Sequence, residues 1–171
     1  TPDGIRERLA SEVACAGVLR RAMDGQRWVT TPAALREEEQ MLATVREGRG
    51  QHDPLKDHHE IGDTKLSDEQ REAVRHVLES TNSVIVVRGR AGVGKTRLMA
   101  EVVRAIEATG TRVQIAAPTG MATHEVLRKD GFTNAQTVAH VLGNAETQSR
   151  LKGGVLWIDE AGLVSVPDMQ A

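Results

Sequence analysis

The stretch "VIVVRGRAGVGKTRLMAEVVRAI", residues Val84 to Ile106, joins three local patterns in one run. A series of β-branched residues comes first and predicts a buried strand. Three glycines separated by other residues follow, and they favour a turn, because glycine weakens both strands and helices. From Lys95 onward, apolar residues recur at helical spacing and predict an amphipathic helix that Gly110 ends. The order strand, glycine-rich turn, helix decides the fold class.

Residues 89–96 match the pattern G-x-x-x-x-G-K-[ST], which marks a turn that wraps a phosphate chain. Glycines let backbone N–H groups point into the turn, and the positive end of the following helix attracts an anion. A plain glycine-rich turn is the alternative, but the strand before it and the helix after it favour a phosphate site. We therefore predict ATP binding by Gly89, Ala91, Gly92, Val93, Gly94, Lys95 and Thr96, with Lys95 also catalytic at the β- and γ-phosphates.

A second motif, "VLWIDE", ends in two acids. Val155–Ile158 predicts a buried strand, and Asp159 follows at its carboxyl end, where ligands bind in open parallel sheets. We predict that Thr96 and Asp159 hold Mg²⁺ and that Glu160 is catalytic by polarising the attacking water. Two solvated acids after a strand are the alternative reading, but the upstream phosphate motif favours a hydrolase.

Strands and helices alternate through the second half of the chain. Ser83–Val87 and Val113–Ala117 are predicted strands, and residues 95–108, 120–129 and 135–142 are predicted helices. This alternation implies parallel strands joined by right-handed crossovers. The predicted fold class is therefore α/β, with a parallel sheet flanked by helices.

Three segments follow from these patterns. Residues 1–50 are predicted to be helical, with one helix reaching about residue 22 and another starting at Pro32 after a Thr31 cap. Residues 51–65 hold few apolar side chains and are predicted to be a linker, whose histidines lack the spacing of a metal site. Residues 66–171 form the α/β domain, which opens with a helix capped by Ser67 and Gln70.

Composition narrows the functional classes. A formal net charge of −2 over 171 residues gives no global basic field, although a local basic groove remains compatible with it. The single cysteine, Cys15, cannot form an internal disulfide and fits a reducing, cytoplasmic compartment. The sequence has no apolar run long enough for a membrane span, so no membrane partner is expected. The chain starts at Thr1, and we expect it to be part of a longer protein.

Four segments together resemble superfamily 1 DNA helicases of the RecD-like type: "LSDEQREAV", "GRAGVGKT", "AAPTGMAT" and "WIDEAGLVS". The resemblance covers about residues 66–170 and is closest to the helicase segment of MobF-type conjugative relaxases. It implies a RecA-like P-loop domain, the first of two in the motor, that hydrolyses ATP and moves on single-stranded DNA in the 5′–3′ direction.

The resemblance also implies roles for polar residues. Gln70 would contact adenine, although the helix cap alone would explain its presence. Thr119 and Gly120, in "APTGMA", would grip the DNA backbone, and Thr137 matches the next DNA-contacting position. A helix cap accounts equally well for Thr119. His140 departs from the family spacing, and we interpret it as a residue on a helix face.

The resembled motor is longer than this chain. It has a strand between the P-loop strand and the Asp-Glu strand, and a second RecA-like domain in the same polypeptide that completes the DNA track. We therefore expect residues 1–171 alone to hydrolyse ATP poorly and not to unwind DNA. Plasmid conjugation is the favoured process. The alternatives are an exonuclease V-type repair ATPase, a protein-remodelling ATPase and a non-enzymatic interaction module.

Overall fold

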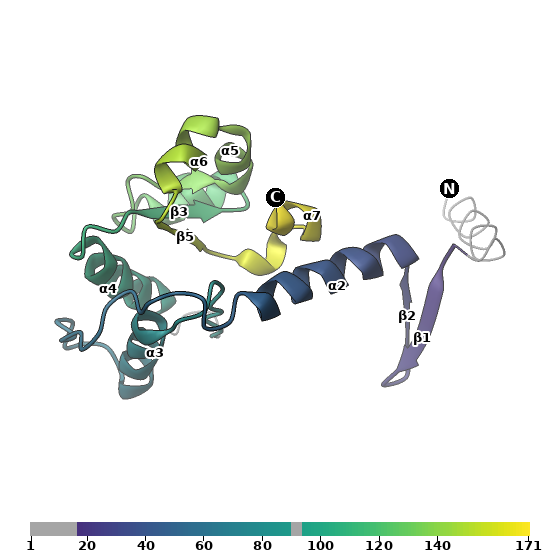
Figure 1. Ribbon diagram of the computed structural model, residues 1–171, viewed down its shortest axis with the longest axis horizontal. Helices are drawn as coiled ribbons and strands as arrows, with labels where there is room; N and C mark the ends of the chain where they lie inside the picture. The colour runs from purple at the N-terminus through teal and green to yellow at the C-terminus, as the bar shows by residue number, and fades with distance from the viewer. Residues whose placement is uncertain (1–16, 90–93) are drawn as a thin grey trace.

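The computed structural model describes residues 17–89 and 94–171. The first part is a hairpin of β1 (Leu19–Met23) and β2 (Gln26–Thr30), followed by helix α2 (Pro32–Glu47). Helices α3 (Asp68–Glu79) and α4 (Lys95–Glu107) then pack together beside a small sheet. Figure 1 shows the hairpin at the end of α2 that lies away from this sheet.

The sheet has three parallel strands, which confirms the predicted α/β class. Its strands are β3 (Val113–Ala117), β4 (Gln136–Thr137) and β5 (Val155–Ile158), in the spatial order β4-β3-β5. Both pairings are parallel. The connecting elements are η1 (Ala122–Leu127), α5 (Val138–Gly143) and α6 (Ala145–Leu151), and η2 (Ala161–Leu163) and α7 (Val166–Gln170) follow β5.

The central strand is buried on both faces. Val113, Ile115 and Ala117 join the main core, which also contains the apolar faces of α3 and α4. Ala116 points the other way into a smaller cluster with Val138 and Val141 of α5. Because side chains alternate along a strand, one short strand contributes to both clusters. This double burial fits a strand that is apolar except at Gln114.

The predicted strand Ser83–Val87 is wrong as a strand. Ile85 and Val87 pack against the main core, whereas Val84 is 44% and Val86 82% exposed. The segment therefore runs along the core and does not pair with any strand of the described β4-β3-β5 sheet. β-branched residues favour an extended backbone, but a strand also needs a neighbour. The resemblance implied that another strand separates this segment from β5, and the two do not pair here.

Three helix predictions also need correction. The helix expected to reach residue 22 is wrong from Leu19, where β1 begins, and its first part lies outside the described residues. The helix expected over 120–129 is present but contains a π-helical stretch, Ala122–Leu127. The helix expected over 135–142 begins later, at Val138, because Gln136–Thr137 pairs with β3.

The predicted linker has no regular structure, but it is attached to the body. The His52 amide donates to the Thr81 carbonyl at 3.0 Å, and the Lys56 amide donates to the Leu78 carbonyl at 3.0 Å. Leu55 and Ile61 pack against the main core. The three-segment division stays a prediction. Within the described ranges, no helix combines the length and hydropathy of a membrane span.

Candidate nucleotide-binding site

The described ends of the glycine-rich turn have the geometry that a phosphate site needs. Gly94 is the N-cap of α4 and has φ of +77°, a left-handed conformation that favours glycine. It has no side chain that could cap the helix, so an anion can approach the first-turn N–H groups of this 13-residue helix. Lys95 donates from Nζ to the Gly89 carbonyl at 3.2 Å, a bond that joins the two described ends of the turn. The predicted residues Ala91, Gly92 and Val93 lie outside the described residues.

Gln70 lies against this turn. Its side-chain Oε1 accepts from the Ser67 backbone amide at 2.8 Å. The Gln70 backbone amide donates to Ser67 Oγ at 3.3 Å, which completes the predicted capping box. The other end of the side chain faces Gly94, where an added Cβ would lie 2.7 Å from Gln70 Nε2. The cap and a position beside the nucleotide turn are therefore compatible, because they use opposite ends of one amide.

The other predicted residues gather at the carboxyl edge of the sheet. Thr119 and Asp159 follow the ends of β3 and β5, and Thr137 is the last residue of β4. Because these strands are parallel neighbours, their carboxyl ends share one edge. Asp159 is half-buried, and its amide donates to the Ala116 carbonyl at 2.9 Å. Glu160 is exposed and has φ of +53°, an uncommon conformation for a residue with a side chain.

Both threonines cap helical turns. Thr119 Oγ1 accepts from the Ala122 amide at 3.1 Å, and Thr137 Oγ1 accepts from the His140 amide at 3.1 Å. The cap that was the alternative for Thr119 is thus present. A hydroxyl that accepts one bond can still donate its proton, so capping leaves each threonine one donor for a phosphate oxygen. Gly120 is exposed beside Thr119, and His140 is exposed on α5 as a residue of a helix face.

The structure forms two groups from the predicted residues. Gln70, Gly94 and Lys95 lie together at the start of α4, whereas Asp159 is hydrogen-bonded into the sheet. Among the described residues, none of the hydrogen bonds joins the first group to the second. Thr96 is half-buried in the first turn of α4, next to Lys95.

Sequence reasoning missed a buried carboxylate on α4. Glu101 is 3% exposed and accepts from His59 Nε2 at 2.8 Å and from the Gly62 amide at 3.1 Å, and its other oxygen accepts from the Arg104 guanidinium. Burial alone would raise the pKa of this carboxyl, but the bonds from His59 and Gly62 and the charge of Arg104 outweigh burial and lower the pKa. The signal was an acid beside the apolar stripe of the predicted helix.

Two of the linker histidines have partners in the body of the protein. His59 bonds to Glu101, and His52 Nε2 lies 2.9 Å from Ser83 Oγ. Within the described ranges, no group of three or more His, Cys, Asp or Glu side chains could hold a metal ion. The bonds of Glu101 hold residues 59–62 against α4, the helix that begins at the glycine-rich turn.

A protein-family model described as an AAA domain matches residues 65–171. The chain belongs to this family. The match includes both the glycine-rich turn and the Asp159-Glu160 edge, so they are parts of one AAA domain of the P-loop class. This result confirms the α/β P-loop fold expected from the sequence.

Three relatives are similar to this chain. The probable conjugal transfer protein TraA of Sinorhizobium fredii (strain NBRC 101917 / NGR234) is 35% identical over 107 residues, which cover 62% of this chain and 10% of that protein. The multifunctional conjugation protein TraI of Escherichia coli (strain K12) is 33% identical over 115 residues, which cover 61% of this chain and 6% of that protein. The conjugal transfer protein TraA of Rhizobium radiobacter is 33% identical over 125 residues, which cover 72% of this chain and 11% of that protein. The chain thus spans 6–11% of the length of these relatives.

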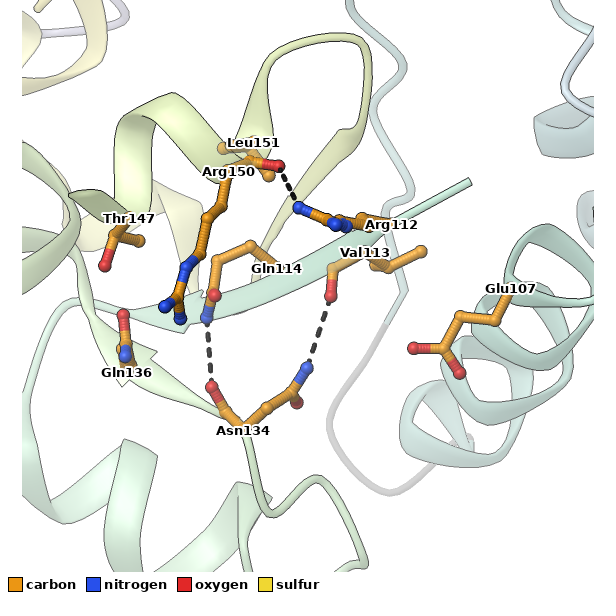
Figure 2. Close-up of a pocket in the computed structure, with 9 residues that line it drawn as sticks. All are labelled: Glu107, Arg112, Val113, Gln114, Asn134, Gln136, Thr147, Arg150 and Leu151. Carbon is orange, nitrogen blue, oxygen red and sulfur yellow. Dashed lines mark hydrogen bonds between the residues drawn. The ribbon is translucent and has the colours of Figure 1, made fainter. Parts of the chain in front are cut away.

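The AAA domain also contains a polar cavity of about 580 Å³ that the sequence did not indicate. Figure 2 shows its lining from β3, β4 and α6, where Arg150, Gln114 and Gln136 point toward one another. Gln114 Nε2 donates to the Asn134 carbonyl at 3.0 Å, whereas Gln136 Oε1 is buried and has no partner among the described residues. The predicted nucleotide residues in the described ranges do not line this cavity, so it is separate from the nucleotide site.

Proposed function

We propose that this chain is the nucleotide-binding part of an ATP-driven DNA helicase that acts in conjugative transfer. The observation that carries the proposal is the contact of Gln70 with the Gly94 turn at the open N-terminus of α4, followed by Lys95. The 33–35% identity to three conjugation proteins supports the choice of process over repair or protein remodelling.

In this proposal, the chain's own groups bind and orient ATP. The Lys95 ammonium neutralises the β- and γ-phosphate oxygens, and the first-turn amides of α4 donate to the same oxygens. Gln70 Nε2 donates to an adenine ring nitrogen while its Oε1 keeps the helix cap. Thr96 and Asp159 would hold Mg²⁺, which supplies charge neutralisation when bound. Glu160 accepts a proton from the attacking water.

Two features of the site fit ATP and Mg²⁺: the space beside Gly94 and the oxygen atoms that could bind the metal. A Cβ at position 94 would take the space beside Gln70 Nε2, so only glycine leaves room for a close approach to the turn. The Thr96 hydroxyl and the Asp159 carboxylate are oxygen ligands of the kind that Mg²⁺ prefers. Hydrolysis requires both groups of residues to act on one bound ATP, and we propose that DNA binding promotes this arrangement.

The threonines supply the DNA contact. Thr119, Gly120 and Thr137 lie at the carboxyl edge of the sheet. There, the hydroxyl of each threonine and the backbone amide of Gly120 can each donate to a phosphate oxygen of single-stranded DNA. Translocation in the 5′–3′ direction needs a second RecA-like domain in the same polypeptide, because one domain has nothing to move against. Residues 1–171 alone therefore hydrolyse ATP slowly.

ATP turnover in the full polypeptide tests the proposal. We expect single-stranded DNA to stimulate hydrolysis and Lys95→Ala to abolish it, while Lys95→Ala leaves the unfolding midpoint near that of the unchanged protein. Turnover that DNA does not stimulate would favour protein remodelling. Near-normal turnover in Lys95→Ala would refute the nucleotide site.

A further inference from the structure

The β1–β2 hairpin exposes a tryptophan beside an arginine. The antiparallel register places Arg21 opposite Trp28 and Arg20 opposite Val29. Residues that face each other across such a pair share one face, with Cβ atoms about 4.5–5.5 Å apart. Arg21 and Trp28 therefore lie side by side, and Trp28 is 61% exposed. A large aromatic ring held at the surface next to a guanidinium is a surface that binds planar groups.

The hairpin is basic, unlike the helix that follows it. Residues 17–30 contain three arginines and one aspartate, a net charge of 3 − 1 = +2, and these are Arg20, Arg21, Arg27 and Asp24. Helix α2 contains two arginines and four glutamates, a net charge of 2 − 4 = −2. The charge therefore changes sign at Thr31. A polyanion is attracted to the hairpin and repelled by α2, which confines its contact to the hairpin.

We propose that the β1–β2 hairpin binds single-stranded DNA, with a base stacked on Trp28 and a neighbouring phosphate paired with Arg21. Stacking on an indole needs an unpaired base, so the hairpin selects single strands over duplex. Arginine adds charge to the phosphates and stacks well beside an aromatic ring. This inference rests on the proposed function and adds a DNA contact outside the AAA domain.

The hairpin is held in a defined position. Its turn, Asp24-Gly25, has φ of +53° and +73°, the tight two-residue turn that keeps the two strands in register. Helix α2 starts next to the hairpin with a Thr31 cap, and its 16 residues span about 24 Å. At the other end, the Ser83 amide donates to the Gly48 carbonyl at 2.7 Å. The hairpin is thus connected through one capped helix to the segment that enters the nucleotide turn.

The carboxyl edge of the sheet faces α2 and the hairpin that α2 carries. Helix α7 follows Asp159-Glu160 and packs on α2, where Gln170 Nε2 donates to the Glu37 carbonyl at 2.6 Å. Figure 1 shows β5 leading toward α7 and α2. DNA bound at Thr119 and Thr137 would leave the domain on the side where α2 carries the hairpin, so one strand can contact both places.

Binding of a labelled oligodeoxythymidylate by fluorescence anisotropy tests the hairpin. We expect Trp28→Ala to weaken the affinity of the chain at least about fivefold, the loss of one stacked base, and Trp28→Phe to keep most of it. Val29→Ala, on the opposite face, is the matched control and leaves the affinity unchanged. Arg21→Ala reduces the slope of log affinity against log salt by about 0.7, since one phosphate contact is lost.

Intrinsic fluorescence gives a direct readout of stacking. The chain has two tryptophans, so Trp157→Phe leaves Trp28 as the single emitter, and the oligonucleotide should quench it. Equal quenching by duplex DNA, or an unchanged affinity in Trp28→Ala, would overturn the hairpin proposal and leave the helicase proposal standing. If the unchanged chain and the full polypeptide both bind no DNA, the two proposals fail together.

Discussion

Replacing Gly94 by alanine tests the nucleotide turn. Two costs follow from the structure. Alanine at φ of +77° costs about 1–2 kcal/mol, because its Cβ crowds the carbonyl oxygen in the left-handed region. The new Cβ would also lie 2.7 Å from Gln70 Nε2. That amide can move away, but its Oε1 then leaves the Ser67 amide, and a lost hydrogen bond costs about 0.5–1.5 kcal/mol.

Gly110→Ala is the matched control for the backbone cost. Gly110 has φ of +84°, and an added Cβ would meet nothing within 4 Å. We expect about 1–2 kcal/mol of destabilisation in Gly110→Ala. In Gly94→Ala we expect about 0.5–1.5 kcal/mol more, because the Gln70 bond is also lost. Urea unfolding followed by circular dichroism measures both values. Adding Gln70→Ala should remove most of the difference, since both backgrounds then lack the bond.

Nucleotide affinity gives the decisive comparison. Gly94→Ala relaxes its strain by moving the turn, and binding must restore the turn, so up to about 1–2 kcal/mol appears as a 5- to 30-fold loss of affinity. Gly110→Ala should bind a fluorescent ATP analogue like the unchanged chain. Unchanged affinity in Gly94→Ala, or an equal loss in Gly110→Ala, would refute the assignment of this turn.

Three further substitutions test separate parts of the structure. Glu101→Gln should destabilise the chain most above pH 4.5, and the effect should fade as the pH falls through the lowered pKa of Glu101, where the carboxylate loses its charge. Urea unfolding at several pH values measures this effect. The same substitution at the exposed residue Glu107, Glu107→Gln, is the control. Thr119→Asp should keep the helix cap and the unfolding midpoint but repel DNA, so unchanged DNA affinity would show that Thr119 only caps. Gln136→Met should raise the unfolding free energy by about 1–3 kcal/mol by removing a buried acceptor, and lower stability would mean that Oε1 has a partner.

Local signals predicted their elements well. The Thr31-Pro32 start of α2 and the Ser67-Gln70 box of α3 depend on bonds within four residues, and both are present. Strand β3 has the predicted bounds, because four of its five residues are apolar and buried, and only Gln114 is polar. The hairpin was missed although Asp24-Gly25 is a strong signal for a two-residue turn.

Non-local contacts explain what the sequence could not predict. Whether Ser83–Val87 becomes a strand depends on a neighbouring strand about thirty or more residues away in the sequence. The residue pattern of the segment itself does not show whether such a neighbour is present. Glu101 reads as a surface acid of α4 until His59 and Gly62 of the linker reach it. Of the predicted nucleotide and acid residues, the described ones include Lys95 at the start of α4 and Asp159 directly after β5, and the sequence alone does not say how these two elements pack.

The position of the nucleotide turn depends on side chains rather than on the sheet. Within residues 17–89 and 94–171, the segment before the turn has no strand partner, and it is held by Ile85 and Val87 on the core and by Ser83 at the end of α2. After the turn, Gln70 lies against Gly94. Side-chain contacts of this kind open at lower free energy than the hydrogen bonds of a paired strand, so residues 83–89 can shift without disrupting the sheet. A strand paired at the centre of the sheet would resist that movement. In this arrangement, the end of α2 contacts Ser83 and the start of α3 contacts Gly94, both from outside the sheet, and we propose that a response to DNA acts through these contacts.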